Sequence, residues 1–251
     1  MKTKFLLTMT SMALFLILFS CKVQDSKGIK QTEEPVVISK SFIEGGPVLT
    51  IDFIKGESHN HPSFAVWVED VNGNLIKTLF VTNAVATGYY NRGDAGDGTW
   101  LTVPGPSNRP AALPYWFHKR ENIYPDQEIV PSPKQPVPDA YTGATPKASF
   151  KLNASTELPD IYKVIVEVNQ PWDWNQYWTN AKFPDEKDYK TSAQPSFIYS
   201  VTVKSSENSG PYYLNPIGHG HYSGKDGLLY TDISTMTTAT NIFDSIILQV
   251  K

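Results

Sequence analysis

The sequence predicts an all-β protein, built as an antiparallel β-sandwich with long irregular loops, and three observations lead to this fold class. Prolines (19), glycines (16) and tyrosines (13) are frequent among the 251 residues, whereas long runs of strong helix formers are few. Several short segments alternate apolar and polar residues, as half-buried strands do. Segments rich in Gly, Pro, Asn and Asp, which favour turns, separate these strands, as in an antiparallel sandwich.

Residues 1–20 have the composition of a bacterial export signal. A basic start is followed by an apolar stretch at residues 5–19, which is shorter than the about 20 apolar residues of a transmembrane helix. The stretch ends in "LFSC" at residues 18–21, and Leu-x-Ser-Cys resembles the bacterial lipobox. The resemblance implies that Cys21 is lipidated and becomes the new N-terminus. The alternative is a cytosolic protein whose first residues are apolar by chance.

Cys21 is the only cysteine, so the chain can form no internal disulfide, and lipidation accounts for this single thiol. Each acyl chain contributes about 0.8 kcal/mol per buried methylene group, so a multiply acylated Cys21 would hold the protein at a membrane. Residues 21–46 are polar and aperiodic, which predicts a flexible tether. We therefore expect an exported, membrane-anchored lipoprotein on the periplasmic face or the cell surface. Its single β-sandwich domain, with a C-terminal extension, is expected at residues 47–251.

The expected strands follow the apolar alternation in chain order. In the first of them, residues 48–55, alternate apolar side chains share one face. Residues 64–70 and 75–81 are expected to form a hairpin closed at Asn72-Gly73, because this pair favours positive φ. The remaining expected strands are residues 148–152, 161–168, 197–203 and 242–250.

Residues 82–135 separate the hairpin from the later strands, and a short helix is expected only at residues 111–120. Loops of this length inside a domain are uncommon unless they are functional. The region therefore either packs over a site or contains elements that its sequence pattern does not reveal.

Four segments between His61 and Asn169 resemble a known family in their order and spacing. They are "HPSFAVWVEDVNGNLIKTL", "LPYWFHKR", "DAYTGATP" and "YKVIVEVN". Over this part, the chain is similar to a predicted periplasmic family, domain of unknown function 2271. "EDVNGNLIKTL" is also similar to the hairpin of the immunoglobulin-like domain in flagellar hook-capping proteins, which implies an immunoglobulin-like sandwich. The family usually continues with Trp-Asp-Gly after its Thr-Gly-Ala-Thr motif, whereas residues 150–154 read Phe-Lys-Leu-Asn-Ala.

The segment "DAYTGAT" at residues 139–145 fits the pattern Asp-x-x-[Ser/Thr]-Gly-Ala-[Ser/Thr]. This pattern resembles the site at which exported flavin transferases attach FMN to the last threonine through a phosphoester. Small residues beside an exposed hydroxyl would leave a transferase room to reach it. The candidate FMN-binding residues are Asp139, Thr142, Gly143, Ala144 and Thr145. The alternative is a plain structural turn before the strand expected at residues 148–152.

Four of the five histidines form two His-x-His pairs, His59 with His61 and His219 with His221. Residues i and i+2 of a strand face the same side, so each pair could present two imidazoles to one metal. If the pairs converge, their nitrogens would suit a transition metal such as Zn, Cu or Ni. The alternative is that the pairs cap a strand or lie in a loop without a metal.

The segment "QPWDWNQYW" places Trp172, Trp174 and Trp178 directly after the strand expected at residues 161–168. Exposed indoles at such an edge could stack on a glycan or contact an envelope protein. The alternative is that they cover the edge of the sandwich and close its core.

Charge and motifs argue against several functional classes. With 22 basic and 25 acidic residues, the net charge of −3 gives no reason to expect nucleic acid as a partner. Glu167 and Asp173 are candidate acids, but no motif pairs them at a defined separation, so we favour a non-catalytic protein. Three functions stay open: an accessory of an extracytoplasmic flavin-linked redox system, a glycan- or protein-binding module, and a metal-binding lipoprotein.

Overall fold

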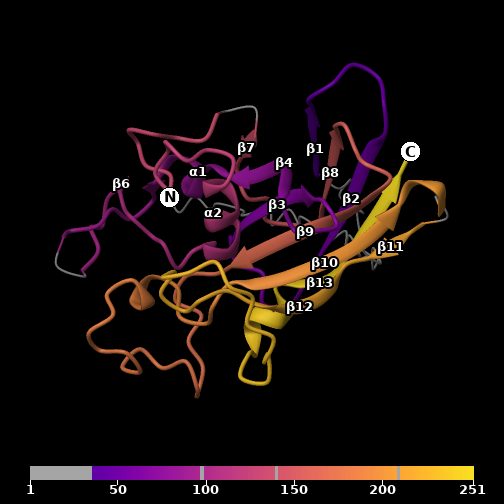
Figure 1. Cartoon of the computed structure of the whole chain (residues 1–251). Helices are drawn as coiled ribbons and strands as arrows, with labels where there is room; N and C mark the ends of the chain where they lie inside the picture. The colour runs from indigo at the N-terminus through magenta and orange to yellow at the C-terminus, as the bar shows by residue number, and fades with distance from the viewer. Residues whose placement is uncertain (1–35, 97–98, 139–140, 208–209) are drawn as a thin grey trace, which may run out of the picture. The chain divides into compact units, whose positions relative to one another are not determined.

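Two β-sheets pack together in the computed structural model, which describes residues 36–96, 99–138, 141–207 and 210–251 (Figure 1). The five-stranded sheet has the order β1 (Val36–Ser41), β8 (Phe150–Ser155), β2 (Val48–Lys55), β13 (Phe243–Val250) and β11 (Tyr212–Tyr213). The six-stranded sheet has the order β12 (Asn215–His219), β10 (Phe197–Lys204), β9 (Ile161–Asn169), β3 (Ser63–Glu69), β4 (Leu75–Thr82) and β7 (Thr142–Gly143). The all-β fold class is confirmed.

Short elements complete the described chain. A two-stranded sheet joins β5 (Tyr89–Tyr90) to β6 (Gly105–Pro106), and the α-helices are α1 (Asn83–Thr87) and α2 (Pro114–Glu121). Turns of 3₁₀ helix occur at Tyr189–Thr191, Ser205–Glu207 and Thr238–Asn241. Helix α2 overlaps the short helix that the sequence predicts at residues 111–120 and ends one residue beyond it.

The main core lies between the two sheets, because alternate side chains of their strands point into the space between them. Ile51 and Phe53 of β2 are fully buried there. Phe53, Phe64, Phe150 and Phe243 form an aromatic cluster whose ring centroids are 4.5 to 6.2 Å apart. Full burial of one phenylalanine contributes roughly 1.5–3 kcal/mol, so this cluster is a major source of stability.

Strand β3 is buried along its whole length, because the six-stranded sheet is covered on both faces. Val66 faces the main core, whereas its neighbour Trp67 faces a second apolar cluster. Helix α2 contributes Trp116 and Phe117 to this second cluster. Region 82–135 therefore packs over the sheet as a covering layer, which explains how so long a segment can lie inside a compact domain.

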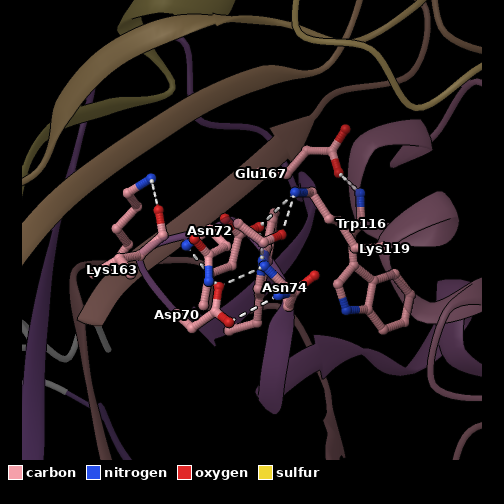
Figure 2. A network of polar contacts seen from close by, with 11 residues as sticks. Asp70, Asn72, Asn74, Trp116, Lys119, Lys163 and Glu167 are labelled. Carbon is pink, nitrogen blue, oxygen red and sulfur yellow. Dashed lines mark hydrogen bonds and ion pairs between the residues drawn. The ribbon is translucent and has the colours of Figure 1, made fainter. Parts of the chain in front are cut away.

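The buried carboxylate of Glu167 fixes the N-terminal turn of α2 to β9. It accepts hydrogen bonds from the backbone N–H groups of Tyr115, at 3.1 Å, and of Trp116, at 2.7 Å (Figure 2). Ser196 Oγ donates a third hydrogen bond, at 2.5 Å. Since the first N–H groups of a helix have no partner within the helix, Glu167 supplies a cap from another part of the chain.

The β3–β4 hairpin holds the other end of α2. Its turn has the expected positive φ of 85° at Gly73, and Asp70 accepts hydrogen bonds from the backbone and side chain of Asn74. Lys119 of α2 donates to the Gly73 carbonyl at 2.6 Å, and its Nζ lies 3.4 Å from the buried carboxylate of Glu69. The expected turn is therefore confirmed, and it also anchors the covering layer (Figure 2).

Three features differ from the sequence prediction. Strand β1 lies inside the predicted tether, residues 21–46, and pairs in parallel with β8, so the sandwich begins before residue 47. Strand β7 pairs in parallel with β4, which adds a second parallel edge to sheets that are otherwise antiparallel. Strands β11 and β12 have no expected counterpart, because they are short and lack a clear alternation.

The predicted export signal at residues 1–20, Cys21 and the first part of the tether lie outside the described residues. Neither helix in the described ranges has the length and apolar character that crossing a membrane requires.

Burial raises the pKa of the Glu167 carboxyl from 4.5 to about 7, so between these pH values the folded chain binds more protons than the unfolded chain. The contribution of Glu167 to the free energy of unfolding therefore falls as pH rises through this window, by on the order of 3 kcal/mol, and is constant above it. The amide that replaces this carboxyl in Glu167→Gln cannot titrate. Urea denaturation from about pH 5 to about pH 8 should show the stability advantage of the wild type over Glu167→Gln shrinking as pH rises.

The exposed Glu157 provides a matched control, and Glu157→Gln should follow the wild-type profile. Parallel profiles for the wild type and Glu167→Gln would contradict the assigned pKa.

Candidate functional site

A cavity of about 410 Å³ at the β7 edge of the six-stranded sheet brings together distant parts of the chain. We call this cavity the Thr145 cleft. Its lining includes polar, charged and aromatic side chains from His61, Thr82, Tyr90, Arg92, Arg109, Thr145 and Trp172. The described residues that line the cleft include no Asp or Glu, so its lining charge is positive.

Thr145 reaches the cleft because the segment before it extends the edge of the sheet. β7 lies beside the end of β4, and a Cβ atom on Gly143 would lie only 2.6 Å from Cε2 of the buried Phe80. Thr145 Oγ1 donates a hydrogen bond to the Pro62 carbonyl at 2.8 Å. Thr142 and Gly143, expected to form a tight turn, are therefore extended, because Phe80 and β4 hold them at the sheet edge.

The other candidate FMN residues have different positions. The Thr142 carbonyl accepts a hydrogen bond from Lys40 Nζ at 2.8 Å, and Ala144 is exposed and lines the cleft. Asp139 lies outside the described residues. The structure thus places Gly143, Ala144 and Thr145 at the cleft.

Thr82, the last residue of β4, presents an unsatisfied hydroxyl. Its Oγ1 is buried and has no hydrogen-bond partner among the described residues, yet Thr82 lines the cleft. An unpaired buried polar group costs about 1–3 kcal/mol, and a ligand atom in the cleft would relieve this cost once the Thr82 side chain turned its hydroxyl toward the cleft.

Arg109 is a buried cation that stacks on aromatic rings. Only 5% of its surface is exposed, and its guanidinium lies 3.8 Å from the ring centroid of Tyr90 and 4.7 Å from that of Trp100. It donates to the Arg92 carbonyl and to Ser107 Oγ. In the described ranges it forms no ion pair. Burial lowers the pKa of Arg109, and the negative charge of Asp94 opposes this shift, as an anion bound in the cleft would.

Trp172 projects an exposed indole at the cleft. It is 43% exposed and adopts a φ of 61°, which is unusual for a bulky residue. Arg92 lies 5.7 Å from its ring centroid, and Trp100 makes an edge contact at 6.4 Å. The next residue, Asp173, accepts a hydrogen bond from Thr238 Oγ1, which holds this backbone in place.

These features define what the cleft can bind. Guanidinium groups recognise carboxylates and phosphates, an exposed indole stacks on the face of a ring, and the two threonine hydroxyls provide polar contacts. The cleft therefore suits a ligand that combines a negative charge with a ring.

The first histidine pair is split between the interior and the surface. His59 is buried, with Nε2 2.9 Å from the Pro146 carbonyl and its ring against Phe243, and burial lowers its pKa. His61 is exposed at the Thr145 cleft, where its Nδ1 lies 3.1 Å from Asn60 Oδ1. Neither residue lies on a strand, so the expected same-face geometry does not apply to this pair.

The second pair, His219 and His221, lines a different cavity, of about 380 Å³. Across the described ranges, no group of three or more His, Cys, Asp or Glu residues is placed to hold a metal ion. The structure does not bring the two pairs together at one cavity, and a metal site formed by either pair stays a prediction.

The three tryptophans of the predicted edge have separate roles. Trp172 lines the Thr145 cleft, whereas Trp174 packs edge-on against Tyr189 at 5.6 Å. Trp178 is 6% exposed and donates from Nε1 to Thr235 Oγ1 at 3.2 Å. Trp174 and Trp178 therefore pack against the core, as the alternative interpretation of this segment expected, and Trp172 alone of the three is exposed.

Sequence reasoning did not find Tyr90, Trp100 and Arg109. They are scattered through the covering layer without a motif, and only their packing creates a stacked guanidinium. The excess of aromatic residues and arginine in a long loop was a weak signal, because such residues are also common in ordinary packing.

Comparison of the chain with protein-family models, with curated proteins and with solved structures finds no match. The resemblance to domain of unknown function 2271 stays a prediction.

Gly143→Ala should destabilise the protein, because the new methyl group would overlap the buried Phe80 ring. Overpacking of this kind costs about 1–3 kcal/mol, which chemical denaturation can measure. Ala144→Ser, at the neighbouring exposed position, should leave the unfolding midpoint unchanged. Equal midpoints for both variants would contradict the packing of Gly143 against Phe80.

Proposed function

We propose that this chain is an exported, lipid-anchored, non-catalytic binding protein whose Thr145 cleft binds an acidic saccharide. The buried Arg109 guanidinium carries the proposal, because it forms no ion pair with a described residue and a cation in that environment gains from an anionic ligand. Export and anchoring rest on residues 1–20 and on Cys21, and place the binding domain outside the cytoplasm. The resemblance to a periplasmic family and to an immunoglobulin-like domain supports the same compartment.

The chemistry of the cleft favours a sugar acid over other anions. A pyranose ring has an apolar face that can pack on the exposed indole of Trp172, while its carboxylate meets Arg92 or Arg109. Its hydroxyl groups could satisfy Thr82, whose side chain lacks a partner among the described residues. The cleft volume of about 410 Å³ is within the range of small-ligand sites.

Titration calorimetry with trigalacturonic acid and with galactotriose tests this proposal, because the two ligands differ in their carboxylates. The acidic trisaccharide should bind and the neutral one should not, and binding should weaken as salt is added. Arg92→Gln and Trp172→Ala should each weaken binding about tenfold, which corresponds to about 1.4 kcal/mol.

Arg92 and Trp172 are both exposed, so Arg92→Gln and Trp172→Ala should fold, and thermal unfolding checks that they do. Lys182→Gln removes a positive charge that lies over Tyr177, outside the cleft, and should bind as the wild type does. Equal binding of the two trisaccharides, or binding indifferent to Arg92 and Trp172, would refute an acidic-saccharide site.

A second candidate function is that of an accessory to an extracytoplasmic flavin-linked redox system, with FMN attached to Thr145. The observation that favours it is the position of Thr145 in the same cleft as two arginines and an exposed indole. Arg92 and Arg109 would offset the charge of the phosphoester, and Trp172 would offer a face to the flavin ring. Thr145 is half-buried and its hydroxyl donates a hydrogen bond to the Pro62 carbonyl, and both features would hinder the attachment of FMN.

Mass spectrometry after co-expression with an exported flavin transferase tests this second function. Flavinylation should add the mass of one FMN moiety to the peptide that contains Thr145, and Thr145→Ala should abolish the addition. A known substrate labelled in the same cells is the control. An unmodified Thr145 peptide beside that labelled substrate would exclude the flavin function.

A further inference from the structure

A second cavity, of about 380 Å³, lies at the end of β12, and no described residue lines both this cavity and the Thr145 cleft. We call it the β12 cavity. Its lining includes Tyr177, Trp178, His219, His221, Tyr222 and Asp232. Its function is independent of the one proposed for the Thr145 cleft.

The walls of the β12 cavity are mainly aromatic. His221 stacks on Tyr222 with ring centroids 4.4 Å apart, and Tyr222 lies 6.3 Å from Trp178. Tyr177 contacts the edge of Trp178 at 5.1 Å and is 50% exposed, so its ring borders the opening. Aromatic walls with a few placed polar groups are typical of sites for small ligands with apolar faces.

The hydrogen bonds of the two histidines define their tautomers. His219 Nδ1 lies 2.7 Å from the Gly220 carbonyl, which can only accept, so Nδ1 carries the proton and Nε2 keeps a lone pair. His221 Nδ1 accepts from the backbone N–H of Ser223 at 3.1 Å, so its proton is on Nε2. Neither Nε2 has a partner among the described residues, which leaves one acceptor and one donor at the same cavity.

The rings of His219 and His221 both contact Tyr230, with centroids 5.5 and 5.8 Å from its ring. A donor and an acceptor on two such rings match the hydroxyl groups of a sugar, each of which both donates and accepts. A metal ion fits less well, because His221 could bind it through Nε2 only by moving its proton to Nδ1, which already accepts the Ser223 N–H. An organic cation fits less well, because the positive charge of Lys182, whose Nζ lies 3.2 Å from the Tyr177 ring centroid and 5.1 Å from that of Trp178, would repel it. An anion would meet the carboxylate of Asp232.

We propose that the β12 cavity binds a neutral saccharide. One sugar ring packs against Tyr177 and the aromatic wall, His219 Nε2 accepts a hydrogen bond from one hydroxyl, and His221 Nε2 donates one to a neighbouring hydroxyl. Asp232 lies at the exposed side of the cavity, where it accepts from a further hydroxyl. The chain then has one site for an acidic saccharide, the Thr145 cleft, and one for a neutral saccharide, the β12 cavity.

Calorimetric titration of the full-length protein with cellohexaose, maltohexaose, mannohexaose and xylohexaose tests this inference. At least one of these neutral oligosaccharides should bind with a Kd between about 10 μM and about 1 mM. Tyr177→Ala and Asp232→Asn should each weaken that binding tenfold or more, whereas Trp172→Ala at the Thr145 cleft should leave it unchanged. His221→Phe, which keeps the ring and removes the donor, should also weaken it.

Tyr177 and Asp232 are both exposed, so their variants decide the question even if His221→Phe fails to fold. The inference is overturned if none of the four oligosaccharides binds, or if binding is indifferent to both Tyr177→Ala and Asp232→Asn. Stoichiometric binding of Zn²⁺ that His221→Ala abolishes would overturn it in favour of a metal. These outcomes involve neither trigalacturonic acid nor Arg92, so they are independent of the test of the Thr145 cleft.

Discussion

Burial of the six-stranded sheet on both faces is the constraint on which the rest of the structure depends. One face of β3 belongs to the sandwich core and the other needs a cover, because Trp67 would otherwise expose a large apolar side chain. Region 82–135 provides that cover. Glu167 holds one end of α2 and Glu69 holds the other through Lys119. Burying a carboxylate costs free energy, which the hydrogen bonds to Glu167 and the ion pair between Lys119 and Glu69 offset.

The covering layer also creates the Thr145 cleft. Tyr90 and Arg109 come from the cover, Thr82 and Thr145 come from the sheet edge, and Trp172 comes from the segment after β9. A cation buried this way is stabilised by stacking between aromatic rings, which keeps it rigid without neutralising its charge. Fold stability and ligand binding are therefore coupled, since loss of the cover would remove Tyr90, Arg92 and Arg109 from the cleft.

The segment after β9 separates the two proposed sites. Its first tryptophan, Trp172, lines the Thr145 cleft, and its last, Trp178, lines the β12 cavity. Trp174 packs against the core between them. A single aromatic segment therefore contributes an indole to each of two separate cavities.

The sequence by itself determined the strands with clear alternation, the hairpin turn at Gly73 and the all-β class, because side-chain period and turn chemistry are local properties. It also marked Thr145 and Trp172 as residues of interest. Only the tertiary structure decided that β1 pairs in parallel with β8 and β7 with β4. It also decided that His61 lies at a different cavity from His219 and His221, and that Arg109 stacks on two aromatic rings. These features depend on contacts between residues far apart in the chain, such as Thr145 and Pro62, 83 positions away, and local pattern carries no information about such partners.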